Sequence, residues 1–212
     1  MAIPSLNVER GGKLFISGPS GSGKTTLLNL AAGLIVSKSG RIMIGDRDMA
    51  KLSGGARDRL RADAIGLIFQ QLNLIPYLSP VQNVCLSTRF SRARHARAGT
   101  DPVKKARELL GAMGMHGTVV EGRAAELSIG QQQRVAAARA LIGQPTLILA
   151  DEPTSALDGL SRDQFMTLLF SQAEECGAAV VMVSHDLGLA ANFDTMVQLQ
   201  DIATFGGHHD AD

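Results

Sequence analysis

Short apolar segments alternate with longer amphipathic segments along this chain of 212 residues. The short segments are rich in Val, Ile and Leu, as are strands that a parallel sheet buries on both faces. We predict strands at Lys13–Ser17, Ile65–Phe69, Thr146–Asp151 and Ala178–Ser184. The spacing of apolar residues also predicts helices at Thr25–Leu34 and Ser161–Glu175. This alternation predicts an α/β fold with a mainly parallel core sheet.

The stretch from Gln71 to Ala125 interrupts that alternation. It contains Pro76, Pro80 and a helical pattern over Pro102–Met113, so we predict an inserted, mostly helical lobe. An Arg-rich run, SRARHAR at Ser91–Arg97, is either a patch that binds a partner or phosphate, or a solvated helix face. Charge runs more often form a solvated face, and we favour that interpretation.

Composition limits the classes of protein to which the chain can belong. A length of 212 residues fits one domain, or one domain with an inserted lobe. The net charge of +1 and the aromatic content of 4% argue against nucleic acid as a partner. Cys85 and Cys176 lack metal-ligand spacing and fit reduced cytosolic thiols. No apolar run approaches the ~18 residues of a membrane helix and no secretion signal is visible, so we expect membrane association only through a partner.

A glycine-rich loop follows the first predicted strand and precedes the first predicted helix. It fits the phosphate-binding pattern G-x-x-x-x-G-K-[ST], in the strand–loop–helix context that this pattern requires. Glycines let backbone N–H groups turn toward phosphate oxygens, and the helix dipole adds to the attraction. Lys24 would reach the β- and γ-phosphates, and the Thr25 hydroxyl would ligate Mg²⁺. We expect nucleotide to be bound by Gly18, Pro19, Ser20, Gly21, Ser22, Gly23, Lys24, Thr25 and Thr26. A glycine-rich turn with a surface lysine is the alternative, and it leaves the strand–loop–helix context unexplained.

Two acidic residues come at the end of the strand predicted at Thr146–Asp151. The carboxyl ends of parallel strands are where α/β sheets place ligand-binding residues. Asp151 is suited to hold Mg²⁺, directly or through water. Glu152 could polarise a water molecule for attack on the γ-phosphate. That Asp-Glu-Pro merely ends a strand is the weaker interpretation, because a phosphate-binding loop lies upstream.

Two further side chains follow predicted strands. His185 closes the segment VVMVSHD, and Gln70 comes after Ile65–Phe69. A lone histidine is more often structural, and neither residue alone would indicate a site. Gln70, however, carries a neutral amide that can orient water or ligate Mg²⁺. We predict that both residues join the catalytic site and that Gln70 is also a metal ligand.

A helix-capping pattern stands near the middle of the chain. Ser128 and Gln131 are spaced as in the S-x-x-Q capping box of a helix start. A capped N-terminus presents free N–H groups and a positive dipole end, so Ser128 and the Gly130 amide could hold a γ-phosphate. From this segment alone, a plain, well-capped and buried helix is the favoured interpretation.

Taken together, these motifs resemble the ATP-binding subunit of an ABC transporter, from about Ile3 to about Asp201. The loop Gly18–Thr25 is similar to the family's Walker A motif, and Leu147–Asp151 is similar to its Walker B motif. The segment Leu127–Gln131 is similar to the LSGGQ signature, which few other P-loop proteins carry.

The remaining motifs follow in the family's order. Glu152 matches the catalytic glutamate, Ser155–Asp158 the D-loop, Gln70 the Q-loop glutamine and His185 the switch histidine. The segments QQQRVAAARAL and LADEPTSALD look most like the subfamily that serves lipoprotein-releasing and macrolide-export permeases.

The resemblance implies a P-loop ATPase that uses ATP and Mg²⁺ and works as a head-to-tail dimer. Each ATP would lie between the P-loop of one chain and the signature of the other, so Ser128, Gly130, Gln131 and Asp158 would complete the partner's site. The cycle would drive an integral-membrane permease, contacted by the lobe and Gln70–Pro80, at the cytoplasmic face of the inner membrane. The alternative is a cell-division-type or regulatory ATPase that signals through a membrane partner. ABC ATPases that act on DNA or ribosomes usually carry coiled-coil insertions or tandem cassettes, and this chain has neither.

The resemblance also implies a division of the chain. We expect a single ATPase domain over residues 1–212, with a RecA-like core at 1–70 and 131–205 and a helical subdomain at about 71–130. The last residues, 206–212 (GGHHDAD), could bind a metal, but a disordered tail is the favoured interpretation.

Two features depart from the family pattern. Ile129 stands where the signature usually has glycine, and β-branched residues tolerate positive φ badly. Either the backbone is ordinary there or dimer closure is less favourable, and we expect function to be retained. The antiparallel β part at the N-terminus is also short, and no aromatic residue precedes Phe15 to stack on adenine. We expect weaker or less base-selective nucleotide binding, or a sequence that starts late.

Overall fold

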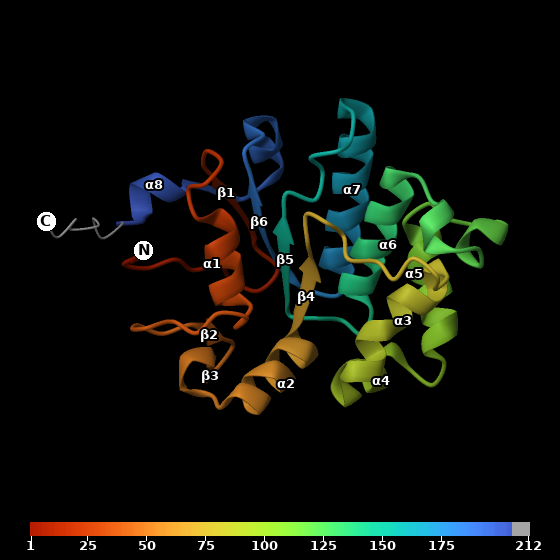
Figure 1. Cartoon of the computed structure of the whole chain (residues 1–212), viewed down its shortest axis with the longest axis horizontal. Coiled ribbons are helices and arrows are strands. Elements are labelled where there is room, and N and C mark those ends of the chain that lie inside the picture. The colour runs from red at the N-terminus through yellow and green to blue at the C-terminus, as the bar shows by residue number, and fades with distance from the viewer. Residues whose placement is uncertain (205–212) are drawn as a thin grey trace, which may run out of the picture.

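A five-stranded sheet forms the centre of the computed structural model, which describes residues 1–204 (Figure 1). The strands lie in the order β4-β5-β6-β1-β7, and every neighbouring pair is parallel. Their bounds are β1 Lys13–Ser17, β4 Ile65–Ile68, β5 Leu147–Asp151, β6 Ala179–Ser184 and β7 Thr195–Gln198. The four predicted strands and the parallel sheet are therefore confirmed. The prediction missed β7, an edge strand whose mostly exposed residues do not form an apolar run.

Helices cover both faces of the sheet. Buried residues of α1 (Lys24–Ala31) and α2 (Gly54–Ala64) pack on one face, and α6 (Ile129–Leu141) and α7 (Gly159–Glu175) pack on the other. A short helix, α8 (Leu199–Ile202), follows β7. Single 3₁₀ turns lie at Met49–Lys51, Gly117–Val120, Ala124–Glu126 and Leu187–Asn192.

Side chains along the central strands alternate between the two faces. In β1, Leu14 and Ile16 pack with Leu28 of α1, whereas Phe15 packs on the opposite side with α6 and α7. Strands β5 and β6 are buried along their whole length. Burial on both faces explains why their sequences read as nearly continuous apolar runs.

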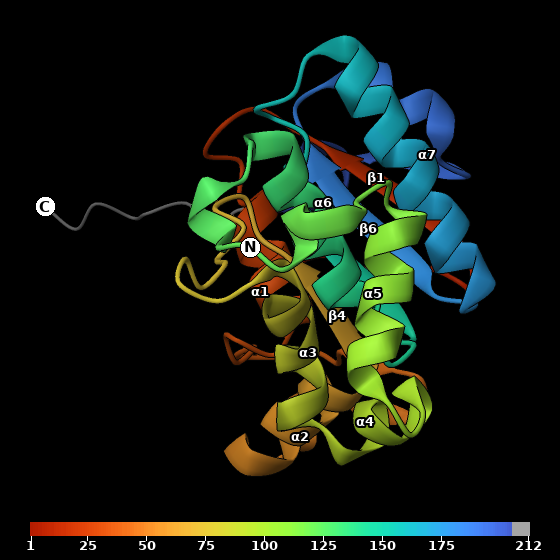
Figure 2. The ribbon, with the colours of Figure 1, turned by 90° about the vertical axis from the view of Figure 1, so that its right-hand side faces the viewer.

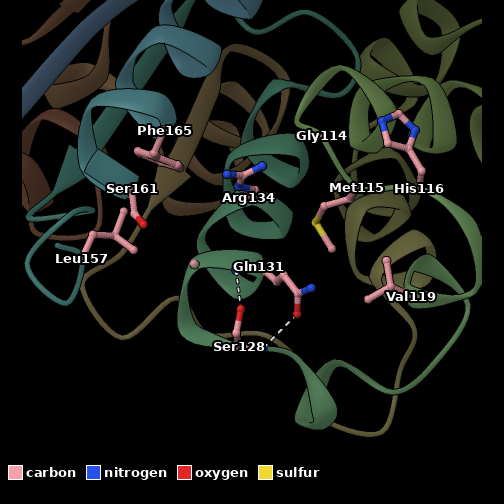
Figure 3. A pocket seen from close by; sticks show the side chains of 11 residues that line it. Gly114, Met115, His116, Val119, Ser128, Gln131, Arg134, Leu157, Ser161 and Phe165 are labelled. Atoms are coloured by element: carbon pink, nitrogen blue, oxygen red, sulfur yellow. Dashed lines mark hydrogen bonds between the residues drawn. The ribbon is translucent and has the colours of Figure 1, made fainter. Parts of the chain in front are cut away.

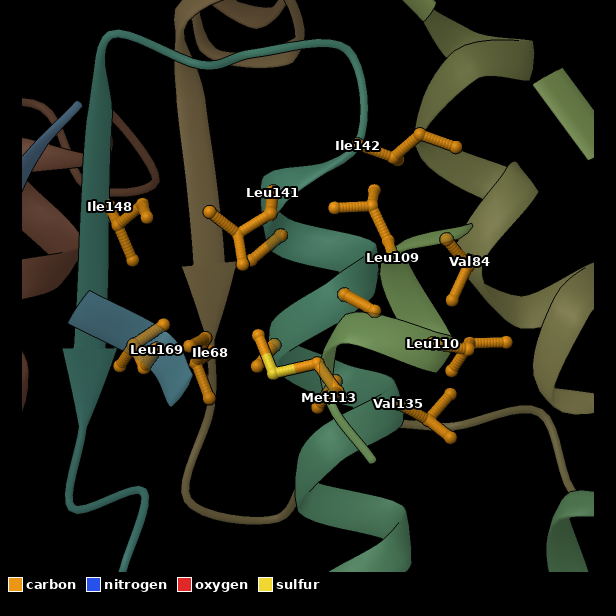
Figure 4. Packing of buried hydrophobic residues seen from close by; sticks show 14 of the residues in the cluster. Ile68, Val84, Leu109, Leu110, Met113, Val135, Leu141, Ile142, Ile148 and Leu169 are labelled. Carbon is orange, nitrogen blue, oxygen red and sulfur yellow. The ribbon is translucent and has the colours of Figure 1, made fainter. Parts of the chain in front are cut away.

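The predicted helical lobe consists of α3 (Pro80–Phe90), α4 (Arg92–Ala98) and α5 (Pro102–Ala112). These helices lie outside α6, on the side away from the sheet (Figure 2). One apolar cluster runs from the sheet through α6 into the lobe (Figure 4); its members include Ile68, Ile148, Leu141, Val135, Val84, Leu109, Leu110 and Met113. The lobe therefore shares its core with the sheet, and α6 is the layer between them.

Close packing of α6 against β4 requires a glycine. A Cβ atom at Gly66 would collide with the carbonyl oxygen of Ala140. Several alanines of α6 are fully buried, and Ala140 is the one that meets Gly66, so the helix axis can approach the strand closely. The tight contact holds the C-terminal end of α6 against β4.

Two local predictions need correction. Helix α1 ends at Ala31 because Gly33 adopts a left-handed conformation with a φ of 65°, so Leu34 is exposed instead of facing the core. The antiparallel β part is present, but it follows α1 as the hairpin of β2 (Met43–Ile44) and β3 (Arg47–Asp48). Upstream of β1, only Ala2 forms an antiparallel bridge, with Thr204.

The Arg-rich run forms α4, and the exposed Arg92, His95 and Arg97 agree with the predicted solvated face, whereas the central arginine does not. Arg94 is only 3% exposed. Its guanidinium donates to Ile142 O at 2.8 Å, to Ile65 O at 3.4 Å and to Ala140 O. Burial lowers the pKa of Arg94 to about 10, so the group remains charged at neutral pH. The last carbonyls of α6, which lack intrahelical partners, thus receive a charged donor from α4.

We predict that Arg94→Met lowers the free energy of unfolding by about 2–4 kcal/mol, because buried carbonyls lose their charged donor. Arg92→Met is the matched control, since Arg92 is exposed on the same helix, and it should change stability by about 0.5 kcal/mol or less. Urea unfolding followed by circular dichroism measures both variants. Equal stability of the two variants would contradict the assigned role of Arg94.

Candidate functional site

Three neighbouring strands bring the candidate residues to one edge of the sheet. Strand β6 lies between β5 and β1, and all three are parallel. Ser17 at the end of β1 pairs in register with Ser184, and Asp151 pairs with Val183. The glycine-rich loop, Glu152 and His185 follow these strand ends directly. Residues far apart in sequence therefore meet at the carboxyl edge, where α/β sheets bind ligands.

The glycine-rich loop curls between β1 and α1 as the motif requires. Gly21 and Gly23 adopt left-handed conformations with φ values of 78° and 93°, and Gly23 caps α1. Gly18 has no room for a side chain, because a Cβ atom there would lie 2.7 Å from the Ser22 hydroxyl oxygen. That hydroxyl is buried without a hydrogen-bond partner in the described residues. An unpaired buried hydroxyl in a glycine cradle fits a phosphate ligand.

The amino group of Lys24 lies inside this loop and is almost fully buried. It donates to Gly18 O at 2.7 Å and to Pro19 O at 3.0 Å. It also lies 3.7 Å from Glu152 Oε1. The lysine predicted to reach phosphate is therefore placed between the phosphate-binding loop and the predicted catalytic carboxylate.

Glu152 is held by both its backbone and its side chain. Its φ of 43° is left-handed, which costs a non-glycine residue about 1–3 kcal/mol and is a frequent feature of functional sites. Its N–H donates to Val183 O at 3.0 Å. The second carboxylate oxygen, Oε2, lies 2.8 Å from Nδ1 of the exposed His185. The structure thus brings Glu152, Lys24 and His185 together, as the sequence predicted.

Asp151 and Thr25 form the acidic side of the site. Burial raises the pKa of the Asp151 carboxyl, while a hydrogen bond with the Thr25 hydroxyl opposes that effect and the neighbouring Glu152 adds to it. A buried carboxylate whose charge is costly is stabilised by a cation. A carboxylate beside a hydroxyl is also the kind of oxygen donor set that Mg²⁺ prefers. These two residues therefore fit a magnesium ion.

Gln70 lies at the same edge but apart from these residues. It comes just after β4, whose Ile68 pairs with Ala150 of β5. Its side chain is exposed. It makes no hydrogen bond to Asp151 or Glu152 within residues 1–204. The strand order places it near the site, and the structure does not bring it into contact.

The predicted signature caps α6 in the expected way. Ser128 N–H donates to Gln131 Oε1 at 2.9 Å, and Gln131 N–H donates to Ser128 Oγ at 3.3 Å, which confirms the capping box. These residues open into a cavity of about 510 Å³ that also includes Gly130, Arg134 and residues of the loop after α5 (Figure 3). Within the described chain, no residue of the glycine-rich loop lines this cavity.

Ile129 has an ordinary backbone conformation. It is the first residue of α6, and it is not among the residues with positive φ. Of the two alternatives for this departure from the signature pattern, the first is therefore confirmed. The side chain is 51% exposed, so it projects from the signature without disturbing the helix.

The D-loop leads into α7 through a capped start. Asp158 accepts hydrogen bonds from the N–H and the hydroxyl of Ser161 at 2.9 and 2.8 Å, and these bonds lower the pKa of Asp158. The next residue, Arg162, forms an ion pair with Asp186 at 2.8 Å. Sequence reasoning missed this contact between the helix after the D-loop and the loop of His185, because neither residue belongs to a motif.

Residues 1–204 contain neither a further metal-binding cluster nor a membrane-spanning helix. No group of three or more His, Cys, Asp and Glu side chains in that range could hold a metal ion. No helix there combines the length and the apolar character needed to cross a bilayer. The tail predicted at 206–212 lies outside the described residues.

Comparison with known proteins gives extensive matches. Residues 2–155 match the family described as ABC transporter. An ABC transporter ATP-binding protein of Methanocaldococcus jannaschii, MJ0796, is 40% identical over 197 residues, which cover 93% of this chain and 83% of that protein. YbbA of Escherichia coli, described in the same way, is 40% identical over 196 residues, with 92% and 83% covered.

A structure and a longer relative extend the comparison. The dimeric structure of a post-hydrolysis state of MJ0796 bound to ADP and Pi matches with a TM-score of 0.81 and 39% identity, over 91% of this chain and 83% of that one. A probable export ATP-binding/permease protein of Pseudomonas fluorescens is 39% identical over 92% of this chain but only 29% of its own length.

These matches cover nearly all of the chain and agree with the motifs placed at the sheet edge. The relatives are also consistent with the lipoprotein-release and macrolide-export subfamily. The chain therefore belongs to the ABC transporter family and is one of its ATP-hydrolysing domains, with the fold of a P-loop NTPase.

Proposed function

We propose that this chain works as a head-to-tail dimer whose ATP cycle drives an integral-membrane permease. The observation that supports pairing is the separation of two half-sites on one chain. Lys24, Asp151 and Glu152 gather at the sheet edge, whereas Ser128 opens into a cavity that the glycine-rich loop does not reach. A second chain in the opposite orientation would join the two halves. The dimeric structure of the relative MJ0796 is consistent with this arrangement.

At the first half-site, the chain binds phosphates and prepares water. The loop amides and Lys24 bind the β- and γ-phosphates. Thr25, Asp151 and Gln70 would hold Mg²⁺, which when bound neutralises charge on the phosphate oxygens. Glu152 accepts a proton from the attacking water, and the His185 ring, 2.8 Å from Oε2, orients that carboxylate.

At the second half-site, the start of α6 offers donors to the partner's nucleotide. The Ser128 oxygen accepts from Gln131 N–H, which leaves its hydroxyl proton available. The amide of Gly130 belongs to the first helical turn, where N–H groups have no intrahelical acceptor. A γ-phosphate from the partner's site suits both donors and the positive end of the helix.

The permease would bind in a groove on the lobe side of the molecule. A cavity of about 240 Å³ lies between α2, β4, α3, α4 and α6 and is lined by Arg61, Phe69, Phe90, Arg94 and Arg139, among others. Phe90 is 79% exposed at its rim. The phenylalanine and arginine side chains that line this groove suit a short amphipathic segment of a membrane protein. The chain would thus be peripheral, at the cytoplasmic face of the inner membrane, without nucleic acid as a partner.

The ATP site and the groove proposed for the permease lie in different parts of the domain. We assign the ATPase core to residues 1–70 and 131–205 and the permease-facing helical subdomain to about 71–130. The alternative function is a cell-division-type or regulatory ATPase. In that case the same groove would bind a membrane protein that transmits a signal and transports no substrate. The two functions differ in whether the physiological effect, transport or signalling, requires ATP hydrolysis.

Glu152→Gln should lower kcat for ATP hydrolysis by about a hundredfold or more, because the general base is lost. Nucleotide affinity should be retained, since the change removes a negative charge beside Lys24. Glu174→Gln, on the exposed end of α7, is the control. Phosphate release and binding of a fluorescent ATP analogue measure the two effects. Hydrolysis by Glu152→Gln within threefold of wild type would exclude Glu152 as the base.

Mixing two inactive variants tests the head-to-tail dimer. Lys24→Ala removes the phosphate-binding lysine, and Ser128→Glu places a carboxylate where the partner's γ-phosphate is expected. Each variant alone should be inactive. An equimolar mixture should recover about a quarter of wild-type activity, since about half of the dimers are mixed and each has one intact site. No recovery, in a mixture shown to exchange subunits, would contradict the proposed pairing.

Phe90→Asp should weaken binding to the permease several-fold, because a carboxylate replaces the aromatic rim of the groove. Val103→Asp is the matched control, since Val103 is an exposed apolar residue of the same lobe outside the groove. Co-purification of membrane proteins from detergent-solubilised membranes measures both. Equal recovery of the two variants, or recovery of nucleic acid in place of a membrane protein, would count against the proposal.

A further inference from the structure

One arginine connects the signature helix to the segment that follows Gln70. Arg139, in the last turns of α6, donates through Nη1 to Asn73 O at 2.6 Å and through Nη2 to Leu72 O. Its own carbonyl accepts from the Ser87 hydroxyl of α3 at 2.8 Å. Burial lowers the pKa of Arg139 from its ordinary value. A partly buried cation thus joins three parts of the chain.

The segment held by Arg139 has an unusual backbone. Leu72 and Asn73 both adopt left-handed conformations, with φ values of 47° and 48°. Asparagine tolerates this region, but leucine rarely adopts it, and such residues persist only where the surroundings hold them in place. The planar guanidinium can bind two neighbouring carbonyl oxygens at once, which a lysine amino group does less well. The conformation just after Gln70 therefore depends on Arg139.

Helix α6 connects the signature residue Ser128 at one end to Arg139 near the other end, so a shift of the helix would move both residues. Arg139 lies about three helical turns from Ser128 on the same helix. The helix is buried between the sheet and the lobe for most of its length. Arg139 also lines the groove proposed for the permease, together with Asn73 and Phe90. The same guanidinium is therefore within reach of the groove, the Gln70 segment and the signature helix.

We propose that Arg139 is a positioning residue that couples Gln70 to the signature helix, so that movement of α6 or occupancy of the groove changes the placement of Gln70 at the ATP site. This inference rests on the proposed function. Arg139 touches neither nucleotide nor water in this scheme and acts through the carbonyls of Leu72 and Asn73.

A second arginine, the buried Arg94, supplies a matched control. Arg94 also binds backbone carbonyls near the end of α6, but its acceptors belong to Ala140, Ile142 and Ile65. None of them lies in the segment after Gln70. Loss of Arg94 should therefore destabilise the fold without freeing that segment, whereas loss of Arg139 should do both.

Hydrogen–deuterium exchange of the full chain tests the anchoring directly. The amides of Leu72 and Asn73 are protected by bonds to Phe69 O and Gln71 O. In Arg139→Met, peptides covering residues 70–74 should exchange about tenfold faster or more, because two charge-assisted hydrogen bonds are lost. Arg139→Lys should restore part of the protection, and Arg94→Met should leave these peptides unchanged. Exchange within twofold of wild type in Arg139→Met, or equal acceleration in Arg94→Met, overturns the proposal.

A double-mutant cycle with Gln70 tests the coupling to catalysis. Arg139→Met should lower kcat about tenfold while the KM for ATP changes less than threefold, because the glycine-rich loop is untouched. In a Gln70→Ala background, Arg139→Met should have no further effect on kcat. Independent, additive losses overturn the coupling. If the wild-type chain does not hydrolyse ATP at all, the proposed function fails, while the exchange measurement still decides whether Arg139 anchors the segment.

Discussion

The parallel pairing of β5, β6 and β1 is the constraint on which the ATP site depends. Each strand contributes one element at its carboxyl end, and the three strands are neighbours in that order. Because β6 lies in the middle, His185 emerges between the phosphate-binding loop and Glu152. A register shift of one residue would turn Asp151 toward the opposite face of the sheet and separate it from Thr25. Burial of both sheet faces holds this register, so the apolar core determines the geometry of the polar site.

Helix α6 is the second constraint, and it links chemistry to the lobe. Its N-terminus carries the signature donors. At its C-terminus, backbone carbonyls accept hydrogen bonds from Arg94, and Arg139 donates to the segment after Gln70. Buried alanines in its C-terminal half and Gly66 allow that half to lie close against β4. The capping box alone would stabilise any buried helix. What distinguishes α6 is that its C-terminal end makes polar contacts with the segment after Gln70, while its N-terminal end carries the donors proposed to bind the partner's nucleotide.

Local patterns predicted most of the fold and the first half-site. Apolar runs gave β1, β4, β5 and β6, and the glycine spacing gave the phosphate-binding loop with Lys24 inside it. The sequence pattern did not predict edge strand β7 or the positions of β2 and β3, because their exposed residues show no regular apolar spacing. The roles of Arg94 and Arg139 also escaped, since both bind backbone carbonyls that any residue could provide. A charge run in sequence cannot reveal which arginine is buried until the fold places a helix end beside it.

The two carboxylate oxygens of Glu152 have different partners, and ATP binding would affect only one of these contacts. One carboxylate oxygen lies 3.7 Å from the Lys24 amino group, and the other lies 2.8 Å from the His185 ring. Phosphate oxygens would compete with Glu152 for Lys24. Binding of ATP would therefore release Oε1 where the γ-phosphate lies, while Oε2 stays oriented by the ring. The backbone of Glu152, held by its hydrogen bond to Val183, keeps the freed oxygen near the phosphate. In the proposed scheme, one carboxylate would pair with the lysine before ATP binds and would serve as the base afterwards.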